Sequence, residues 1–304
     1  MTEWLPKWKS NNWRTAKGTT PANLDLFLAL DSVVTTLESE NLTIGFWYIP
    51  REHNKIADRL AKAAASFDLH SPSPLVQPAR QRHMMSAAAP DDPRILLVSL
   101  DTASPFDQLY QGLLGKLNTV AALDRATKPE SVLQGLADQP PQAVLVTDSG
   151  IVQHRAVYAK LLDYVRGGGR LVFMGNFSTM TTTKDIDRLF QEAGLPWTHG
   201  AYQRTTVHRN DTEDTSSHTS LPPSYSQKAV FLAGVPDKDA WYLPKDSSHT
   251  ESHVFYPVPI TDQEQTPIAL TNIGKGKLGY VGDVNGEEGS DAVVLAMCGL
   301  RDNA

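Results

Sequence analysis

Polar residues follow several apolar stretches between residue 93 and the end of the 304-residue chain, where a predicted strand gives way to a turn or helix. Carboxylate, hydroxyl and amide groups gathered at such strand ends can hold a sugar or a divalent cation. The same residue types also cap helices and shape turns, which is the simpler interpretation. The candidates for such a crevice are Asp101, Asp148, Ser149, Asn176, Asp283 and Asn285.

A second set of candidate residues lies near the N-terminus. Asn54, Asp58 and Lys62 are four residues apart and therefore share one face of a predicted helix. Taken alone, this spacing suits an ordinary solvated face, on which Asp58 pairs with Lys62 at i,i+4. The first seventeen residues combine tryptophan with positive charge, which suits contacts with nucleic-acid phosphates. The candidates there are Lys7, Lys9, Trp13, Arg14 and Lys17.

Apolar patterns predict the elements that would position both sets. The N-terminal part is predicted to contain a helix over 23–39, the strand "LTIGFWYI", and a helix from Asn54. Downstream, strands are predicted at "RILLVSL" (94–100), "TVAAL" (119–123), "QAVLVT" (142–147), "RLVFMG" (170–175), "PIALTNI" and "KLGYVGDV", with helices at 153–165, 184–193 and 290–297. This alternation predicts a three-layer α/β domain with a parallel sheet covered on both faces.

Composition shifts divide the chain. Residues 67–92 are rich in Pro, Ser and Ala and are predicted to be a linker between a module at 1–66 and an α/β domain at 93–304. Residues 198–262 are polar and turn-rich, and they are predicted to interrupt the α/β domain as an insertion without regular structure.

Composition also excludes several functional classes. Cys298 is the only cysteine, which rules out disulfides within the chain and cysteine-rich zinc sites. The net charge of −6 argues against a protein that coats nucleic acid along its whole surface. The chain has no long apolar run and no apolar N-terminal leader. We therefore expect an intracellular protein, in the cytoplasm or nucleus, without a membrane partner.

The N-terminal segment resembles a known nuclease family. "WKSNNWRTAKGTTPANLDLFLALD" followed by "FWYIPREHNKIADRLAKAAA" resembles the C-terminal half of type 1 ribonuclease H, in the same order and at the same spacing. The combination is fairly specific, although each motif alone is weak. The resemblance covers about a fifth of the chain.

This resemblance implies roles for particular residues. In the family, four carboxylates hold two Mg²⁺ ions that activate water to cleave the RNA strand of an RNA–DNA hybrid. Asp58 matches the last of these metal-binding carboxylates, and Asn54 matches the polar residue one turn earlier. His53 lies in the loop that carries the family's catalytic histidine, but it directly precedes Asn54 and so departs from the family register. The other three carboxylates would precede Met1, so we expect nucleic-acid binding by a catalytically incomplete module.

Residues 93–304 resemble the class I glutamine amidotransferase-like family, which has a flavodoxin-like fold. The motifs that carry the resemblance are loose: "RILLVSL", "AVLVTDSGI", "YVRGGGRLVFMGNFS" and "GKLGYVGDVNGEEGSDAV". Active members place a nucleophilic cysteine at the turn where this chain has Asn176 or its neighbours. Because an amide is not a practical nucleophile, we expect no glutamine hydrolysis. A non-catalytic α/β domain that binds a small molecule or acts as a scaffold is therefore the alternative hypothesis, and a hydrolase built on Asp and His groups ranks last.

Overall fold

The computed structural model describes residues 93–101, 106–216, 220–251 and 256–300, together with scattered residues between 10 and 39. The chain divides into two compact units, Met1–Gln77 and Pro78–Ala304. The predicted linker and the boundaries at its two ends lie outside the described residues, so they stay predictions.

In the first unit, every described residue from Leu24 to Ser39 is helical, as the apolar spacing predicts for 23–39. The hydroxyl groups of Thr35 and Thr36 donate to the backbone oxygens of Asp31 and Ser32, at 2.8 and 3.0 Å. These contacts span one helical turn, which is the usual local bond of a threonine inside a helix.

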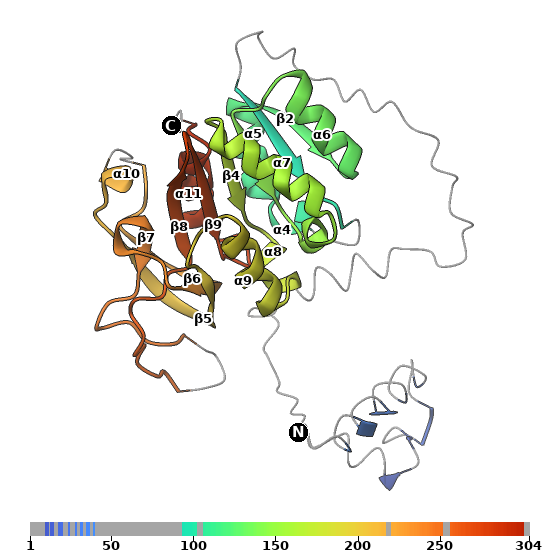
Figure 1. Cartoon of the computed structure of the whole chain (residues 1–304). Coiled ribbons are helices and arrows are strands. Elements are labelled where there is room, and N and C mark those ends of the chain that lie inside the picture. The colour runs from blue at the N-terminus through green and yellow to red at the C-terminus, as the bar shows by residue number, and fades with distance from the viewer. Residues whose placement is uncertain are drawn as a thin grey trace, which may run out of the picture. The chain divides into compact units, whose positions relative to one another are not determined.

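The second unit is built on a nine-stranded sheet, and half of this sheet is parallel. β2 (Ala122–Ala126), β1 (Arg94–Val98), β3 (Ala143–Val146), β4 (Arg170–Phe173) and β9 (Gly276–Val281) follow one another across it. Each pairs with its neighbour in parallel register. β9 lies beside β4 although residues 174–275 separate them in the sequence (Figure 1).

The other half of the sheet is antiparallel, so the predicted all-parallel sheet is wrong. β8 (Ile268–Ile273) pairs with β9, and β7 (Ala240–Leu243), β5 (Thr198–Arg209) and β6 (Ser224–Ala233) continue the order. β5, β6 and β7 come from the segment predicted to be an irregular insertion. This segment therefore extends the sheet instead of interrupting it.

The outer side of β6 is hydrogen-bonded to residues next to β8 and β9. The amide of Val230 donates to the oxygen of Gly282 at 3.0 Å, and the amide of Val284 donates to the oxygen of Lys228 at 3.0 Å. Leu232 and Thr266 exchange two backbone hydrogen bonds, at 2.8 and 3.0 Å. Residues just before β8 and just after β9 thus cover the outer side of β6, and the antiparallel half closes on itself.

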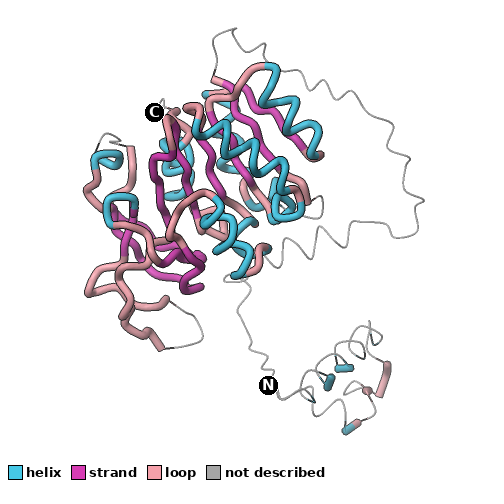
Figure 2. Tube along the Cα trace, viewed as in Figure 1, coloured by secondary structure: helices cyan, strands magenta, loops and turns pink. Residues whose placement is uncertain are grey.

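Helices cover both faces of the parallel strands (Figure 2). One face packs α6 (Pro129–Asp138), α7 (Arg155–Arg166) and α9 (Thr183–Glu192) against alternate strand residues such as Val146 and Phe173. The other face packs α5 (Gln111–Val120) and α11 (Glu288–Met297) against residues such as Leu145 and Val172. Burial on both faces explains why these strands read as continuous apolar runs. The remaining short helices are α4 (Phe106–Leu109), η2 (Ser149–Gln153), α8 (Phe177–Met180), α10 (Glu213–Ser216) and η3 (Asp237–Asp239).

One predicted strand begins too early. Residues 119 and 120 end α5, and β2 begins at Ala122.

In the described part of the chain, no helix combines the length and the apolar character needed to cross a bilayer.

Candidate functional site

Asp148 is the second residue after β3 and is 1% exposed. Its Oδ1 accepts hydrogen bonds from the backbone amides of Leu100 (3.2 Å) and Gly150 (2.9 Å), so it ties the end of β1 to the start of η2. Its Oδ2 has no hydrogen-bond partner among the described residues. Burial raises the pKa of this carboxyl above its ordinary value.

Gly150 allows the two loops to meet. A Cβ at this position would lie 2.6 Å from the Cβ of Leu100 and 2.8 Å from the backbone nitrogen of Asp101. A larger residue would therefore push the two strand ends apart.

Asp283 has the corresponding place after β9. It is 1% exposed, and its carboxylate accepts from the amides of Asn285 (2.9 Å) and Glu287 (2.7 Å). Asn285 donates from Nδ2 to Glu287 at 3.3 Å. The simpler interpretation of these residues is therefore confirmed, because Asp283 and Asn285 shape the turn that leads into α11.

Three further predicted residues lie at the same edge of the sheet. Asn176 precedes α8, is 5% exposed, and makes no side-chain cap bond to that helix. Asp101 and Ser149 line a common pocket of about 420 Å³. The structure thus brings Asp101 and Ser149 together, with Asp148 next to Ser149 in the chain, but Asn176, Asp283 and Asn285 do not line this pocket.

The pocket also contains residues that the sequence interpretation missed. His154 comes from the start of α7, and Thr181, Thr182 and Asp185 come from the junction of α8 and α9. Thr182 caps α9: its hydroxyl accepts from the amide of Asp185 at 3.3 Å and donates to the Asp185 carboxylate at 2.7 Å. The Thr-x-x-Asp spacing is the sequence signal that could have located this corner.

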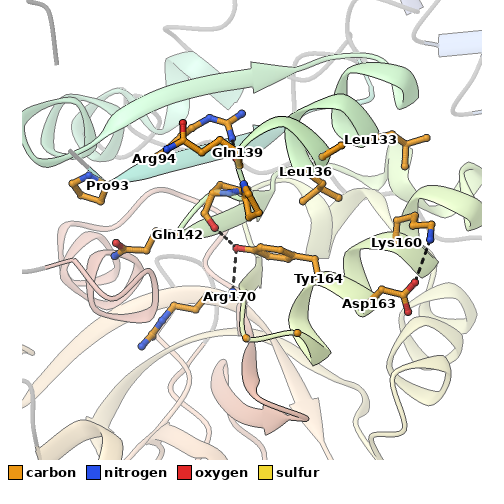
Figure 3. A pocket seen from close by; sticks show the side chains of 16 residues that line it. Pro93, Arg94, Leu133, Leu136, Gln139, Gln142, Lys160, Asp163, Tyr164 and Arg170 are labelled. Atoms are coloured by element: carbon orange, nitrogen blue, oxygen red, sulfur yellow. Dashed lines mark hydrogen bonds and ion pairs between the residues drawn. The ribbon is translucent and has the colours of Figure 1, made fainter. Parts of the chain in front are cut away.

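A larger pocket of about 1190 Å³ lies between α6 and α7, toward the amino ends of the parallel strands (Figure 3). Tyr164 occupies its centre, where its hydroxyl donates to the oxygen of Pro141 (2.8 Å) and accepts from the amide of Arg170 (3.2 Å). The guanidinium of Arg94 donates to the oxygens of Gly135 and Gln139. The polar groups here hold the fold together, and ligands of open α/β sheets collect at the other end of the strands. The smaller pocket is therefore the better candidate site.

Cys298 directly follows α11 and is fully buried. Burial raises the pKa of its thiol to about 12. The thiolate is the nucleophilic form of cysteine, so Cys298 is not suited to covalent catalysis at neutral pH. Cys298 packs as a small apolar side chain in the core.

The buried carboxyls give the second unit a defined pH dependence. Burial raises the pKa values of Asp148, Asp283 and Asp291 in the folded state. The folded state therefore binds more protons than the unfolded state above the ordinary carboxyl pKa of 3.8, and this contribution to stability falls as pH rises through the raised values. We expect the thermal midpoint of the chain to decrease as pH rises above 3.8 through the raised pKa values, and to decrease less in Asp148→Asn. Calorimetry across this range checks the slope, and an equal slope in both proteins would contradict the assignment to Asp148.

Most predicted nucleic-acid residues lie outside the described residues: Lys7, Lys9, Lys17, His53, Asn54 and Asp58. Trp13 is half-buried with a positive φ of 55°, and the exposed Arg14 donates to the oxygen of Gly18 at 3.0 Å. Within the described ranges, no group of three or more His, Cys, Asp or Glu side chains is arranged to hold a metal ion. The predicted role of Asp58 as a metal ligand therefore stays a prediction.

Comparison with known sequences gives matches to ribonucleases H. Ribonuclease H from Actinobacillus pleuropneumoniae serotype 5b (strain L20) is 39% identical over 66 residues, which is 22% of this chain and 42% of that protein. Part of this chain is ribonuclease H-like. Ribonuclease H from Ehrlichia canis (strain Jake) is 39% identical over 71 residues, covering 22% of this chain and 44% of that protein. Ribonuclease HI from Streptomyces coelicolor is 35% identical over 71 residues, covering 21% of this chain and 29% of that protein.

The ribonuclease H-like segment thus spans less than half the length of these relatives. No protein-family model matches the chain. Among solved structures, a beta-galactosidase from Bacillus circulans sp. alkalophilus aligns with a TM-score of 0.44 and 11% identity, over 69% of this chain and 32% of that chain. A cytoplasmic protein from Salmonella typhimurium LT2 aligns with a TM-score of 0.36 and 14% identity, over 63% of this chain and 88% of that chain. Likenesses at these TM-scores carry no inference about the chemistry of the second unit, and its resemblance to amidotransferases stays a prediction.

Proposed function

We propose that the ribonuclease H-like segment, residues 1–66, binds nucleic acid and prefers an RNA–DNA hybrid. The observation that carries the proposal is the 39% identity to a ribonuclease H over 66 residues. The order of the motifs supports it. The tryptophan-containing basic segment, the helix from Leu24 and the predicted helix around Asp58 follow one another as in that family.

The chemistry of the segment suits a nucleic-acid backbone. Lys7, Lys9, Arg14 and Lys17 supply positive charge within a short stretch, and phosphate contacts of this kind position a duplex without reading its sequence. Arg14 is exposed, as a phosphate contact requires. Trp13 offers an aromatic surface in the same turn.

Asp58 is the proposed metal ligand, and Asn54, one turn earlier, is a proposed nucleic-acid contact. A bound Mg²⁺ would activate water and stabilise the leaving oxygen. The described residues show no site that fits such an ion, so we assign no catalytic step to this chain. Asp58 is the one matched carboxylate, and a single carboxylate cannot hold two divalent ions at the geometry of cleavage.

Duplex binding by the full 304-residue chain tests the proposal. Fluorescence anisotropy would compare a labelled RNA–DNA hybrid with a DNA duplex of the same sequence over a series of salt concentrations. We expect tighter binding to the hybrid. The association constant K falls as salt rises, so the slope of log K against log salt is negative. The double variant Lys7→Ala with Lys9→Ala is expected to make this slope shallower by about two, because two phosphate contacts are lost.

A matched control removes two lysines from the second unit. Lys238 and Lys275 are exposed there, so the double variant Lys238→Ala with Lys275→Ala loses the same charge without touching the segment. It is expected to keep the slope of the unmodified chain. Equal loss in both double variants, or no preference for the hybrid, would refute the proposal.

Cleavage gives a separate result. We expect no Mg²⁺-dependent cleavage of the RNA strand by the 304-residue chain, and no change in Asp58→Asn. Cleavage that is lost in Asp58→Asn would show that the site is complete and would overturn our expectation of an incomplete module.

A further inference from the structure

The pocket at the carboxyl ends of β1 and β3 has the size of a small ligand. Its volume is about 420 Å³, at the lower end of the range for small-molecule sites. One wall comes from η2 and the start of α7, and the other comes from the junction of α8 and α9. The pocket therefore lies between two helical segments at the edge of the sheet where ligands of this fold class bind.

Two buried oxygens without a hydrogen-bond partner among the described residues belong to this region, one on a lining residue of the pocket and one on its chain neighbour. Thr181 lines the pocket and is 8% exposed, and its hydroxyl has no hydrogen-bond partner among the described residues. Oδ2 of Asp148, the residue before the lining residue Ser149, is also buried without a partner in the described ranges. Buried polar atoms in native proteins nearly always have partners, so a group from outside the chain is expected here.

The charges of the pocket lining disfavour an anionic ligand. Asp101 and Asp185 line it, and neither lysine nor arginine is present among the described lining residues. A phosphate or carboxylate would face like charge at close range. The acidic lining and the buried Asp148 thus favour a neutral or a positively charged ligand.

Existing contacts weaken the case for a cation. The carboxylate of Asp185 already pairs with Arg188 at 2.9 Å and accepts from Thr182 at 2.7 Å. The described ranges also contain no cluster suited to a metal ion. What the walls still offer are hydroxyl, amide and imidazole groups of Ser149, Gln153, His154 and Thr181, which both donate and accept.

Apolar side chains also line the pocket, on both walls. Met180, which is 50% exposed, lies on α8, Val152 lies on η2, and Leu100 follows β1. A ligand that carries both C–H and hydroxyl groups matches this mixture of surfaces. We propose that the pocket binds a neutral sugar of monosaccharide size, with the Thr181 hydroxyl and its polar neighbours hydrogen-bonded to the sugar hydroxyls.

Ligand-observed NMR on the full chain tests the proposal. Saturation-transfer difference spectra would be recorded with D-glucose, D-galactose and D-ribose as probes. Putrescine and glucose 6-phosphate serve as cationic and anionic comparisons. We expect transfer to at least one neutral sugar, and none to putrescine or glucose 6-phosphate.

Thr181→Val removes the hydroxyl with little change of shape, and it is expected to weaken sugar binding about tenfold. Thr271→Val is the matched control, because Thr271 is equally buried, at 8%, on β8 and does not line the pocket. The control is expected to bind as the unmodified chain does. Gln153 is an exposed lining residue, so Gln153→Ala is expected to weaken sugar binding without affecting folding. This variant keeps the proposal testable if Thr181→Val does not fold.

The outcomes are distinct. Sugar binding that falls in Thr181→Val or Gln153→Ala, but not in Thr271→Val, supports the proposal. Absence of transfer to every neutral sugar would overturn it, and so would binding of putrescine or glucose 6-phosphate alone. Sugar binding that neither lining variant changes would place the sugar elsewhere and would also overturn it.

Discussion

Replacing Phe173 with alanine is expected to lower the free energy of unfolding of the second unit by about 3–5 kcal/mol. Phe173 is fully buried at the end of β4. Its ring lies 4.5 Å from that of Phe177, 5.8 Å from that of Phe190 and 6.2 Å from that of Tyr158, measured between centroids. The substitution removes the shared member of this cluster and leaves a cavity that the rigid strand cannot close.

Urea denaturation of the full chain, followed by circular dichroism, measures the loss. Phe173→Leu fills most of the cavity and should cost less than the alanine variant. Leu133→Ala on α6 is the control for apolar loss at the surface, because Leu133 is 39% exposed. It is expected to change stability by less than about 0.5 kcal/mol. Equal costs for Phe173→Ala and Leu133→Ala would contradict the packing described here.

Asp148→Ala is expected to lower the free energy of unfolding by about 2–4 kcal/mol. The backbone amides of Leu100 and Gly150 would lose their shared acceptor, and each unsatisfied buried group costs about 1–3 kcal/mol. Removal of a poorly solvated carboxylate offsets part of this cost. The same denaturation experiment at neutral pH measures the difference.

Asp148→Asn separates the hydrogen bonds from the charge. The amide oxygen can accept from both backbone amides, and the amide nitrogen would take the place of Oδ2, which has no partner among the described residues. We therefore expect a change within about 1 kcal/mol of the unmodified chain. A loss as large as that of Asp148→Ala would show that the negative charge, and not the acceptor, holds the two loops.

Strand burial explains which elements could be predicted. β1, β3 and β4 are buried along nearly their whole length, so their sequences are unbroken apolar runs and the predictions are close to the observed bounds. β2 lies at the edge of the sheet, where Asp124 and Arg125 are exposed and Ala126 alone is fully buried. The apolar residues that end α5 therefore displaced the predicted strand toward the N-terminus.

The antiparallel strands were missed for a related reason. In β5 only Thr205 and Val207 are buried, and the rest of the strand carries partly exposed polar side chains. Such a strand lacks the apolar run by which the parallel strands are recognised. Its register depends on β6 and β7, which lie tens of residues further along the chain.

The candidate site shows the same limit. The rule that parallel strands end at one edge is enough to place Asp101 and Ser149 near each other. It does not reveal Thr181, whose position depends on how α8 and α9 pack against η2. Nor does it tell a carboxylate that faces a pocket from one that organises a turn, which is the observed role of Asp283.

Because the antiparallel half of the sheet closes on itself, we expect its strands to unfold together with those of the parallel half. Val230 and Leu232 on β6 are hydrogen-bonded to Gly282 and Thr266, and Lys277 on β9 forms an ion pair with Asp214 at 2.7 Å. The amides of Val230 and Leu232 can exchange with solvent only when the contacts beside β8 and β9 break. Hydrogen exchange in these strands therefore reports on the same cooperative unit as exchange in β4 and β9, and the described part of the 198–262 segment unfolds together with the rest of the second unit.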